Sequence, residues 1–260
     1  SKNYHIYAFG GQTNSKEMTT QDLGAYNAEF NFWMNLTQPN ATNPFARAAH
    51  SSTFIPDRNS FIIFAGYSLN TDSLYTLSSR NDTWEYFLDN GTWHELETAN
   101  GSYPVYPTDE SAIVYDSDRK VLFVCGGMNT WPDNLTYEYS FESKQWTRIM
   151  NSSGFAPRND HGAVYVPYDK SVYVFGGQCY SGTPFSFCIR GDFVRYNTTT
   201  QQWTTLNITG GPPPLMSFVM QLWDDETFIL HGGCSNMTYA PHYVPFCDVY
   251  STKTYLFNAR

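Results

Sequence analysis

One phrase recurs five times along this chain: a short apolar run that ends in two small residues, usually two glycines. The double-glycine sites lie between 50 and 61 residues apart. Self-similarity at such a period predicts that each copy is one supersecondary unit packed on its neighbours. We therefore expect one repeat domain over residues 1–260, with approximate repeats 1–43, 44–100, 101–153, 154–210 and 211–260. The five sites are Gly10-Gly11, Ala65-Gly66, Gly126-Gly127, Gly176-Gly177 and Gly232-Gly233.

An aromatic pair follows the glycines in the first four repeats, with a Tyr seven residues before a Trp. The two-residue period of strands places Tyr and Trp on neighbouring strands of a hairpin, with a polar turn between them. Four residues before the Tyr stands an Asp, except in the third repeat, where Leu135 replaces it. The fifth repeat lacks the Trp, and we expect Tyr255 or Phe257 to substitute. The pairs are Tyr26 and Trp33, Tyr86 and Trp93, Tyr139 and Trp146, and Tyr196 and Trp203; the acidic residues are Asp22, Asp82 and Asp192.

The strand before each glycine pair is apolar throughout, as in residues 61–64. A continuous apolar run is typical of a strand covered on both faces. Acidic residues in the turn before it, such as Asp116 and Asp224, favour turn formation over calcium binding because they recur at one hairpin position. Ala65 replaces the first glycine of its pair, so we expect smallness to matter there and backbone freedom to matter at Gly66.

These markers together resemble the kelch repeat, a four-stranded blade of a β-propeller. The likeness extends over essentially the whole chain. It implies an all-β fold of four-stranded antiparallel blades, with five repeats read either as five blades or as part of a six- or seven-bladed ring. Extracellular kelch segments of attractin-like proteins are similar, and galactose-oxidase-type propellers are more distant relatives. Kelch propellers mostly serve as protein-binding platforms, so the resemblance implies binding to other proteins.

Potential N-glycosylation sites are unusually frequent. Ten of the twenty asparagines stand in Asn-x-Ser/Thr sequons, none with Pro in the middle. Any one sequon is a weak signal, but this density favours the secretory pathway and an extracellular or cell-surface protein with N-linked glycans. The ten are Asn35, Asn40, Asn81, Asn90, Asn100, Asn134, Asn151, Asn197, Asn207 and Asn236.

The cysteines point to the same compartment. Cys179 and Cys188 bracket the loop after one glycine pair, and Cys234 and Cys247 bracket the equivalent loop of the next repeat. Two loops closed in the same way predict two local disulfides, each contributing roughly 2–3 kcal/mol. Cys125 lies inside an apolar strand, so we interpret it as a free, buried thiol.

Topology assigns these features to one face of the blades. In an up-and-down blade, the loops between strands two and three share a face with the connections between blades. Both cysteine pairs and eight of the ten sequons fall there, whereas Asn90 and Asn197 lie in turns on the opposite, hairpin face. Because bulky glycans hinder protein contact, we expect a partner to dock on the hairpin face or rim.

Several functions are disfavoured. The net charge is -9 without a Lys/Arg run, which disfavours nucleic-acid binding, and no apolar run approaches the ~20 residues of a transmembrane segment. His50 and His161 occupy repeat positions, each three residues after Arg47 or Arg158, and are interpreted as structural. His231 lies beside a glycine pair and has no second metal ligand at a diagnostic spacing. We therefore expect neither a metal, nor a cofactor, nor catalysis.

The tripeptide Arg190-Gly191-Asp192 spells an integrin-adhesion motif, but Asp192 holds the repeat register of Asp22 and Asp82. We therefore interpret it as structural. The function that the sequence favours is a non-catalytic, extracellular, N-glycosylated propeller that binds proteins, glycans or copies of itself. One alternative is a structural subunit of an extracellular coat, wall or filament. A second is a galactose-oxidase-like copper oxidoreductase, for which Cys125 is a conceivable cross-link partner.

Overall fold

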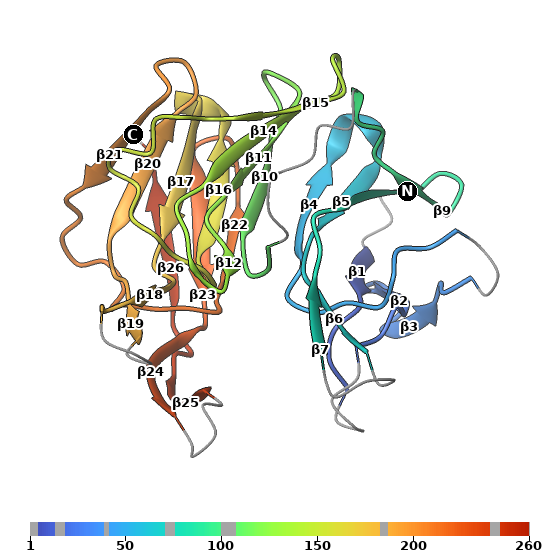
Figure 1. The fold of residues 1–260 in the computed structure, drawn as a ribbon, viewed down its shortest axis with the longest axis horizontal. Coiled ribbons are helices and arrows are strands. Elements are labelled where there is room, and N and C mark those ends of the chain that lie inside the picture. Colours follow the sequence, from blue (N-terminus) through green and yellow to red (C-terminus); the bar gives the residue numbers. More distant parts are fainter. Residues whose placement is uncertain are drawn as a thin grey trace. The chain divides into compact units, whose positions relative to one another are not determined.

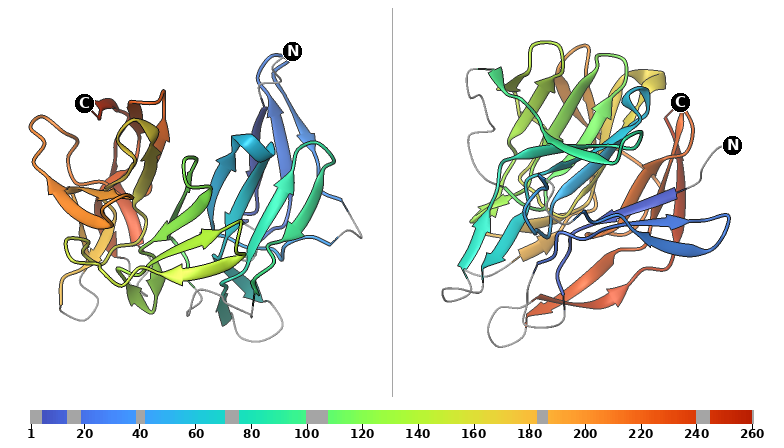
Figure 2. Two further views of the ribbon diagram at one scale, coloured as in Figure 1. Left: turned by 90° about the horizontal axis from the view of Figure 1, so that it is seen from above. Right: turned by 90° about the vertical axis from the view of Figure 1, so that its right-hand side faces the viewer.

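The computed structural model describes residues 5–13, 19–38, 42–70, 76–99, 108–182, 187–239 and 245–259. The chain divides into two compact bodies. The first body comprises Ser1–Glu97 and Val105–Asp109, and the second comprises Thr98–Pro104 and Glu110–Arg260. Figure 2 shows the chain from two further sides, with the sheets of the second body coloured from green to red.

Among its described residues, the first body contains two antiparallel sheets and one ribbon (Figure 1). Blade 1 has three strands, and blade 2 has four with a two-stranded ribbon inserted between its second and third strands. Blade 1 consists of β1 (His5–Phe9), β2 (Leu23–Asn27) and β3 (Phe32–Asn35). Blade 2 consists of β4 (Ser51–Ile55), β5 (Ser60–Phe64), β8 (Thr83–Phe87) and β9 (Thr92–Glu95), and its ribbon of β6 (Tyr67–Asn70) and β7 (Thr76–Ser79).

In its described part, the second body contains three antiparallel sheets, each with a ribbon between its second and third strands. Blades 3 and 4 have four strands, and blade 5 has three. Blade 3 consists of β10 (Ala112–Asp116), β11 (Val121–Cys125), β14 (Thr136–Ser140) and β15 (Gln145–Arg148); blade 4 of β16 (Gly162–Val166), β17 (Ser171–Phe175), β20 (Phe193–Asn197) and β21 (Gln202–Leu206); blade 5 of β22 (Val219–Leu222), β23 (Thr227–His231) and β26 (Thr254–Asn258). The ribbons are β12 (Met128–Asn129) with β13 (Trp131–Pro132), β18 (Gln178–Tyr180) with β19 (Phe187–Ile189), and β24 (Cys234–Tyr239) with β25 (Pro245–Tyr250).

This architecture confirms the predicted fold class, an all-β propeller fold with five antiparallel blades. The apolar strands that define the repeat are the second described strands of blades 2 to 5, and β1 in blade 1; β5 and β17 are buried at every residue. In the second body, neighbouring blades cover β17 on both faces: Val172 and Val174 pack with Phe123 of blade 3, and the Tyr173 ring lies 5.3 Å from the Phe228 ring of blade 5. The continuous apolar run thus reflects cover on both faces, as predicted.

The predicted aromatic hairpins are present. Tyr196 and Trp203 are direct cross-strand partners, as are the other three Tyr–Trp pairs. Trp203 also stacks on Phe155, with ring centroids 4.2 Å apart, which fixes the fourth strand of blade 4 to the preceding connection. Blade 5 differs. Its Phe257 is the cross-strand partner of Phe228 on the second strand, and in blade 4 the equivalent partner of Val172 is Tyr196. Phe257 therefore occupies the Tyr position, and the expectation that Tyr255 or Phe257 replaces the Trp is wrong because β26 is the third strand of its blade.

The glycine pairs need both smallness and backbone freedom. Ala65 has a φ of 58°, so the first position is left-handed even where it is not glycine. A Cβ at Gly10, the same position of blade 1, would lie 2.6 Å from the Arg47 carbonyl oxygen. At the second position, Gly177 has a φ of 94°, outside the region that other residues adopt readily. Our expectation was incomplete, since the first position also requires a left-handed backbone.

The acidic turn residues act as predicted. Asp116 Oδ1 accepts hydrogen bonds from the backbone N–H groups of Asp118 and Arg119, and Asp224 Oδ1 accepts from those of Glu226 and Thr227. A carboxylate that holds its own turn in this way explains the recurrence of acidic residues at this hairpin.

Candidate functional site

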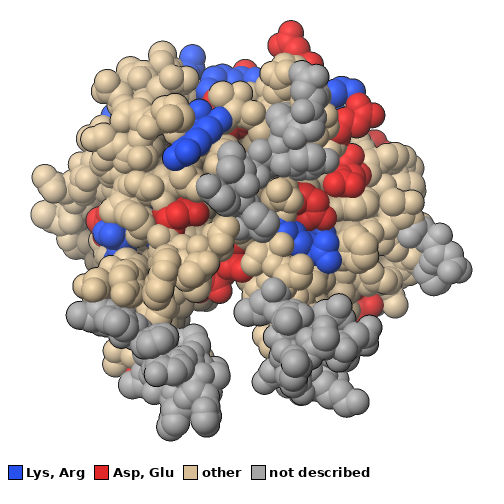
Figure 3. Space-filling view, viewed as in Figure 1, with Lys and Arg blue, Asp and Glu red and all other residues tan. Residues whose placement is uncertain are grey.

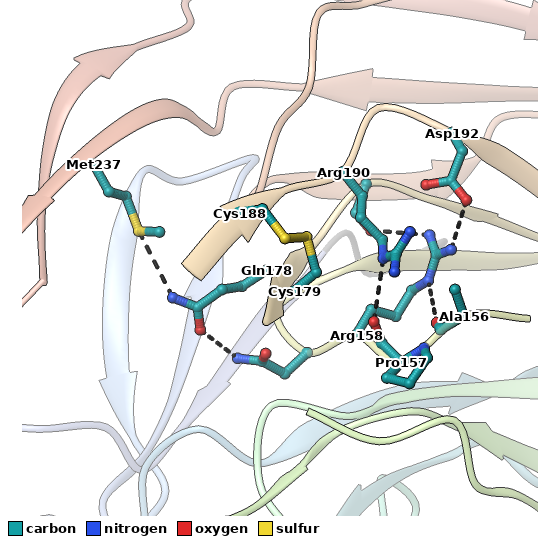
Figure 4. Close-up of a disulfide and its surroundings, with 11 residues drawn as sticks. Ala156, Pro157, Arg158, Gln178, Cys179, Cys188, Arg190, Asp192 and Met237 are labelled. Carbon is teal, nitrogen blue, oxygen red and sulfur yellow. Dashed lines mark hydrogen bonds and ion pairs between the residues drawn. A yellow bond between two sulfur atoms is a disulfide. The ribbon is translucent and has the colours of Figure 1, made fainter. Parts of the chain in front are cut away.

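Both predicted disulfides are present, and each closes a ribbon of the second body. Cys179 and Cys188 are directly opposite each other in the β18–β19 register, with Cα atoms 4.9 Å apart (Figure 4). Cys234 and Cys247 link β24 to β25, with Cα atoms 5.7 Å apart. These ribbons are consequently the cross-linked variable loops of the blades, and Figure 1 shows both at one end of their sheets.

An exposed aromatic pair lies on two neighbouring ribbons. Trp131 of β13 and Tyr180 of β18 have ring centroids 4.7 Å apart and planes inclined by 44°. Trp131 is 46% exposed and Tyr180 is 37% exposed, although the two rings contact each other. Large aromatic side chains that remain accessible on a rigid support are typical of binding sites.

A buried polar network adjoins this aromatic pair. Gln178 lies two residues before Tyr180, on the same face of β18. The Asn159 amide donates to Gln178 Oε1 at 3.0 Å and to Glu110 Oε2 at 2.5 Å. Asn159 is completely buried, and its Oδ1 has no hydrogen-bond partner among the described residues. In Figure 4, Gln178 also reaches Met237, whose sulfur accepts from its amide at 3.9 Å.

The adhesion-like tripeptide is part of the scaffold. Asp192 accepts from the buried Arg158 guanidinium at 2.7 Å, and Arg190 Nε donates to the Pro157 carbonyl at 3.1 Å (Figure 4). A Cβ at Gly191 would lie 2.9 Å from the Pro214 ring. These contacts support the predicted structural role of Asp192.

His161 and Cys125 form a buried pair, with Nε2 and Sγ 3.6 Å apart. Burial raises the pKa of the Cys125 thiol to about 12. Burial and the charge of Arg158 lower the pKa of His161 to about 3. Both groups are therefore neutral near pH 7, and since the thiolate is the nucleophilic form, the pair lacks an activated nucleophile. Cys125 is free and buried, as the sequence indicated.

The remaining histidine candidates do not assemble a metal centre. Burial and the charge of Arg47 lower the pKa of His50 to about 4. His231 is exposed, and its Nδ1 lies 2.8 Å from Thr254 Oγ1. Within the described ranges, no three His, Cys, Asp or Glu side chains are grouped so that they could hold a metal ion.

The sequons differ in accessibility. The Asn134 side-chain nitrogen, the atom that would carry a glycan, donates to Ser152 Oγ at 3.3 Å and to the Phe155 carbonyl at 3.2 Å. Asn81 and Asn197 are also half-buried. Asn40 and Asn100 lie outside the described residues. The exposed sequon asparagines are Asn35, Asn90, Asn151, Asn207 and Asn236.

Charge is distributed without a dominant positive area on the face that Figure 3 shows, where the described lysines and arginines lie in small groups among acidic and uncharged residues. Phosphate backbones require clustered positive charge, so this face does not resemble a nucleic-acid interface. None of the helices in the described residues is long and apolar enough to span a membrane.

Comparison with known proteins identifies the family. The profile described as Attractin/LZTR1 beta-propeller matches residues 2–237, most of the chain. The chain belongs to this family. The predicted resemblance to attractin-like kelch propellers is thereby confirmed.

The individual relatives are distant and longer. The leucine-zipper-like transcriptional regulator 1 homolog of Drosophila melanogaster is 25% identical over 214 residues, which are 77% of this chain and 20% of that protein. The Mei4-dependent protein 6 of Schizosaccharomyces pombe is 24% identical over 190 residues, 67% of this chain and 26% of that protein. The human leucine-zipper-like transcriptional regulator 1 is 29% identical over 142 residues, 52% of this chain and 16% of that protein. The chain thus spans about a quarter or less of these relatives.

Sequence reasoning missed the Trp131–Tyr180 pair and the Asn159 network. Trp131 lies outside the repeat register of Trp33, Trp93 and the other hairpin tryptophans, in a segment of variable length. The sequence could have indicated the site only through Trp131 itself, a large aromatic residue that the repeat pattern does not require. Its contact with Tyr180, 49 positions further along the sequence, depends on the packing of two ribbons and was not predictable from spacing.

Proposed function

We propose that this chain is a non-catalytic, extracellular, N-glycosylated propeller that serves as a scaffold for binding other proteins. The exposed Trp131–Tyr180 pair is the observation that carries this proposal. Trp and Tyr are enriched among the residues that dominate binding energy at interfaces. Here they stand on ribbons supported by a packed blade scaffold, so little conformational entropy is lost when a partner binds.

The cross-links and the sequons support the proposed compartment. Disulfides persist in oxidising compartments and are rare in the cytosol. Two ribbons are closed by disulfides, and five sequon asparagines are exposed. These observations support secretion, with the glycans on the exposed asparagines.

We propose that the chain is not an enzyme, because Cys125 and His161 are both uncharged near pH 7. A galactose-oxidase-like site needs clustered copper ligands and a Tyr–Cys cross-link. Cys125 instead contacts His161, and its burial disfavours the reactive thiolate.

A structural subunit is the second candidate, and one observation favours it. Trp33 in blade 1 is 60% exposed, whereas its counterpart Trp93 in blade 2 is 8% exposed. Ile6 on the same face of blade 1 is exposed too, as is Leu256 on β26 of blade 5. Exposed apolar sheet faces are typical sites of association.

The test uses the chain secreted from eukaryotic cells. Purified cell-surface and secreted proteins are screened for saturable binding, before and after enzymatic removal of N-glycans, and light scattering reports self-association. Binding that survives deglycosylation of a monomeric chain supports the scaffold. Concentration-dependent assembly without any heterologous binding would favour the structural subunit and contradict the scaffold.

A further inference from the structure

We infer that an N-glycan on Asn35 folds back onto blade 1, where its first sugar, N-acetylglucosamine, packs on the exposed ring of Trp33. This inference rests on the proposed function, because it requires a secreted and glycosylated chain. It assigns one glycan a structural role within the molecule. Three features of blade 1 carry it: an uncovered Trp, a sequon asparagine two residues further along the same strand, and a glycine opposite that asparagine.

Trp33 differs from the other hairpin tryptophans in its exposure. It is 60% exposed, whereas its three counterparts are 7% or 8% exposed. In blade 2, the Phe9 ring of blade 1 lies 5.0 Å from the Trp93 ring. In blade 4, the Phe123 ring of blade 3 lies 6.1 Å from the Trp203 ring. A large apolar ring that the repeat covers with an aromatic side chain is therefore left open in blade 1.

Asn35 is placed to bring a sugar to this ring. It is the last residue of β3, it is exposed, and it forms a sequon with Thr37. Residues two apart in a strand point to the same face and lie about 7 Å apart, so Asn35 and Trp33 share the uncovered face. Asn35 Oδ1 accepts from the Thr37 backbone N–H at 2.9 Å. The side-chain nitrogen, which would carry the glycan, has no hydrogen-bond partner among the described residues.

The sequon and the exposed Trp occur in the same hairpin. At the equivalent position, two residues after the Trp, the other three hairpins carry residues that cannot be N-glycosylated: Glu95, Arg148 and Thr205. In those hairpins the Trp is buried. This coincidence is expected if a sugar covers the ring in blade 1 as protein side chains cover it elsewhere.

Gly24 keeps the space beside Asn35 open. The two residues are directly opposite each other in the β2–β3 register. At the equivalent position the other hairpins carry large or branched side chains, those of Trp84, Tyr137 and Val194. The backbone of Gly24 is not left-handed, so its conformation does not require glycine. A Cβ on Gly24 would lie 3.3 Å from the Trp33 ring, which shows that this ring leans toward the Gly24–Asn35 pair, where the glycan begins.

The chemistry of a pyranose suits this surface. One face of the sugar ring presents mainly C–H groups, and an aromatic ring face carries the partial negative charge that attracts such hydrogens. The hydroxyl groups at the rim of the sugar stay in water, so none is buried without a partner. Attachment to Asn35 makes the contact intramolecular, which gives the sugar a high effective concentration at the ring. A sugar over Trp33 would also block the association of copies through this face of blade 1.

The experiment compares the wild-type chain, Asn35→Gln, Trp33→Leu and the double variant, all secreted from eukaryotic cells. Glycopeptide mass spectrometry establishes which sequons are occupied. Thermal unfolding measures the coupling between positions 33 and 35; the turn hydrogen bond that Asn35→Gln removes is lost in both backgrounds, so its effect cancels. Hydroxyl-radical footprinting measures the oxidation of Trp33, with Trp223, which is 70% exposed, as the reference. Asn207→Gln, which removes another exposed sequon, is the matched control.

We expect Asn35 to be occupied and Asn35→Gln to lower the thermal midpoint by about 2–4 °C more in the wild-type background than in the Trp33→Leu background. Asn35→Gln should also raise the oxidation of Trp33 but not of Trp223, and Asn207→Gln should change neither. Equal thermal shifts in the two backgrounds, unchanged oxidation of Trp33, or an unoccupied Asn35 beside an occupied Asn207 would overturn the contact but leave the proposed function intact. A chain without any occupied sequon would overturn both.

Discussion

Arg158 is completely buried, and its guanidinium donates to the Asp192 carboxylate at 2.7 Å and to the Gly176 carbonyl at 3.1 Å. Blade 2 repeats the pair, with Arg47 and Asp82 also 2.7 Å apart. In blades 3 and 5 both partners are absent together. The backbone hydrogen bonds of the glycine pairs identify the equivalent residues. For blade 3, Thr108 replaces the Arg and Leu135 replaces the Asp. For blade 5, Leu215 replaces the Arg and Lys253 replaces the Asp. Blade 1 differs, because Asp22 holds the acidic position there and accepts a hydrogen bond from the Thr20 hydroxyl at 2.7 Å.

Replacing only one member of the Arg158–Asp192 pair should lower the free energy of unfolding by more than its share of the loss in the double variant. Asp192→Leu leaves a buried guanidinium unpaired, so we expect it to lower the free energy of unfolding by about 3–5 kcal/mol. Arg158→Leu should cost less, because the Asp192 side chain is 31% exposed and water can solvate it. The double variant should cost less than the sum, as measured by urea unfolding. Additive effects would show that the two side chains do not stabilise each other.

The second glycine of the blade 4 pair should tolerate no side chain. Gly177 has a φ of 94°, and a Cβ there would lie 2.6 Å from the Asn159 carbonyl oxygen. Gly210 has a φ of 75° with open space around it, so Gly210→Ala isolates the backbone penalty of about 1–2 kcal/mol. We expect Gly177→Ala to lower the thermal midpoint clearly more than Gly210→Ala. Equal shifts would remove the steric part of the explanation.

Acidification should destabilise the second body through His161. The pKa of His161 is lowered to about 3 in the folded chain, so between about 6.5 and 3 the unfolded chain binds the additional proton. Its contribution to stability is therefore full above pH 6.5 and declines as pH falls. Asp133 acts in the opposite sense, because burial raises its pKa to about 6 and the folded chain takes up the proton first.

The variant His161→Phe tests the contribution of His161 alone. Phenylalanine suits this position because blade 5 carries Phe218 at the equivalent place beside its glycine pair. We expect stability to fall less steeply with acidification in this variant than in the wild type, as followed by unfolding between pH 7 and about pH 4. An unchanged pH slope would exclude His161 as the responsible group, whatever the variant does to absolute stability.

Glycan occupancy should follow side-chain exposure. A glycan on Asn134 would break its hydrogen bonds to Ser152 and Phe155, whereas Asn207 is exposed. Glycopeptide mass spectrometry of the folded, secreted chain should therefore find Asn207 occupied and Asn134 largely unmodified. High occupancy at Asn134 in folded protein would contradict the described geometry and restore the case for a shielded loop face.

The repeat made the fold predictable, while the candidate site was not. Each Tyr–Trp pair has a fixed separation within one hairpin, so its cross-strand contact followed from the period of a strand. Likewise, Cys179 and Cys188 bracket a single loop. Trp131 and Tyr180 belong to different blades, and their contact depends on how two ribbons pack. Prediction was also incomplete at Ala65. The sequence indicated that a small residue is needed there, but it did not indicate the left-handed backbone.

The most direct test of the account is non-reducing peptide mapping, with glycopeptide analysis, of the chain secreted from eukaryotic cells. The account predicts Cys179 linked to Cys188, Cys234 linked to Cys247, Cys125 as a free thiol that alkylates only after unfolding, and glycans on the exposed sequons. Reduced Cys179 and Cys188 together with unoccupied sequons would contradict it, because an extracellular scaffold with a cross-linked binding ribbon would then have no chemical basis.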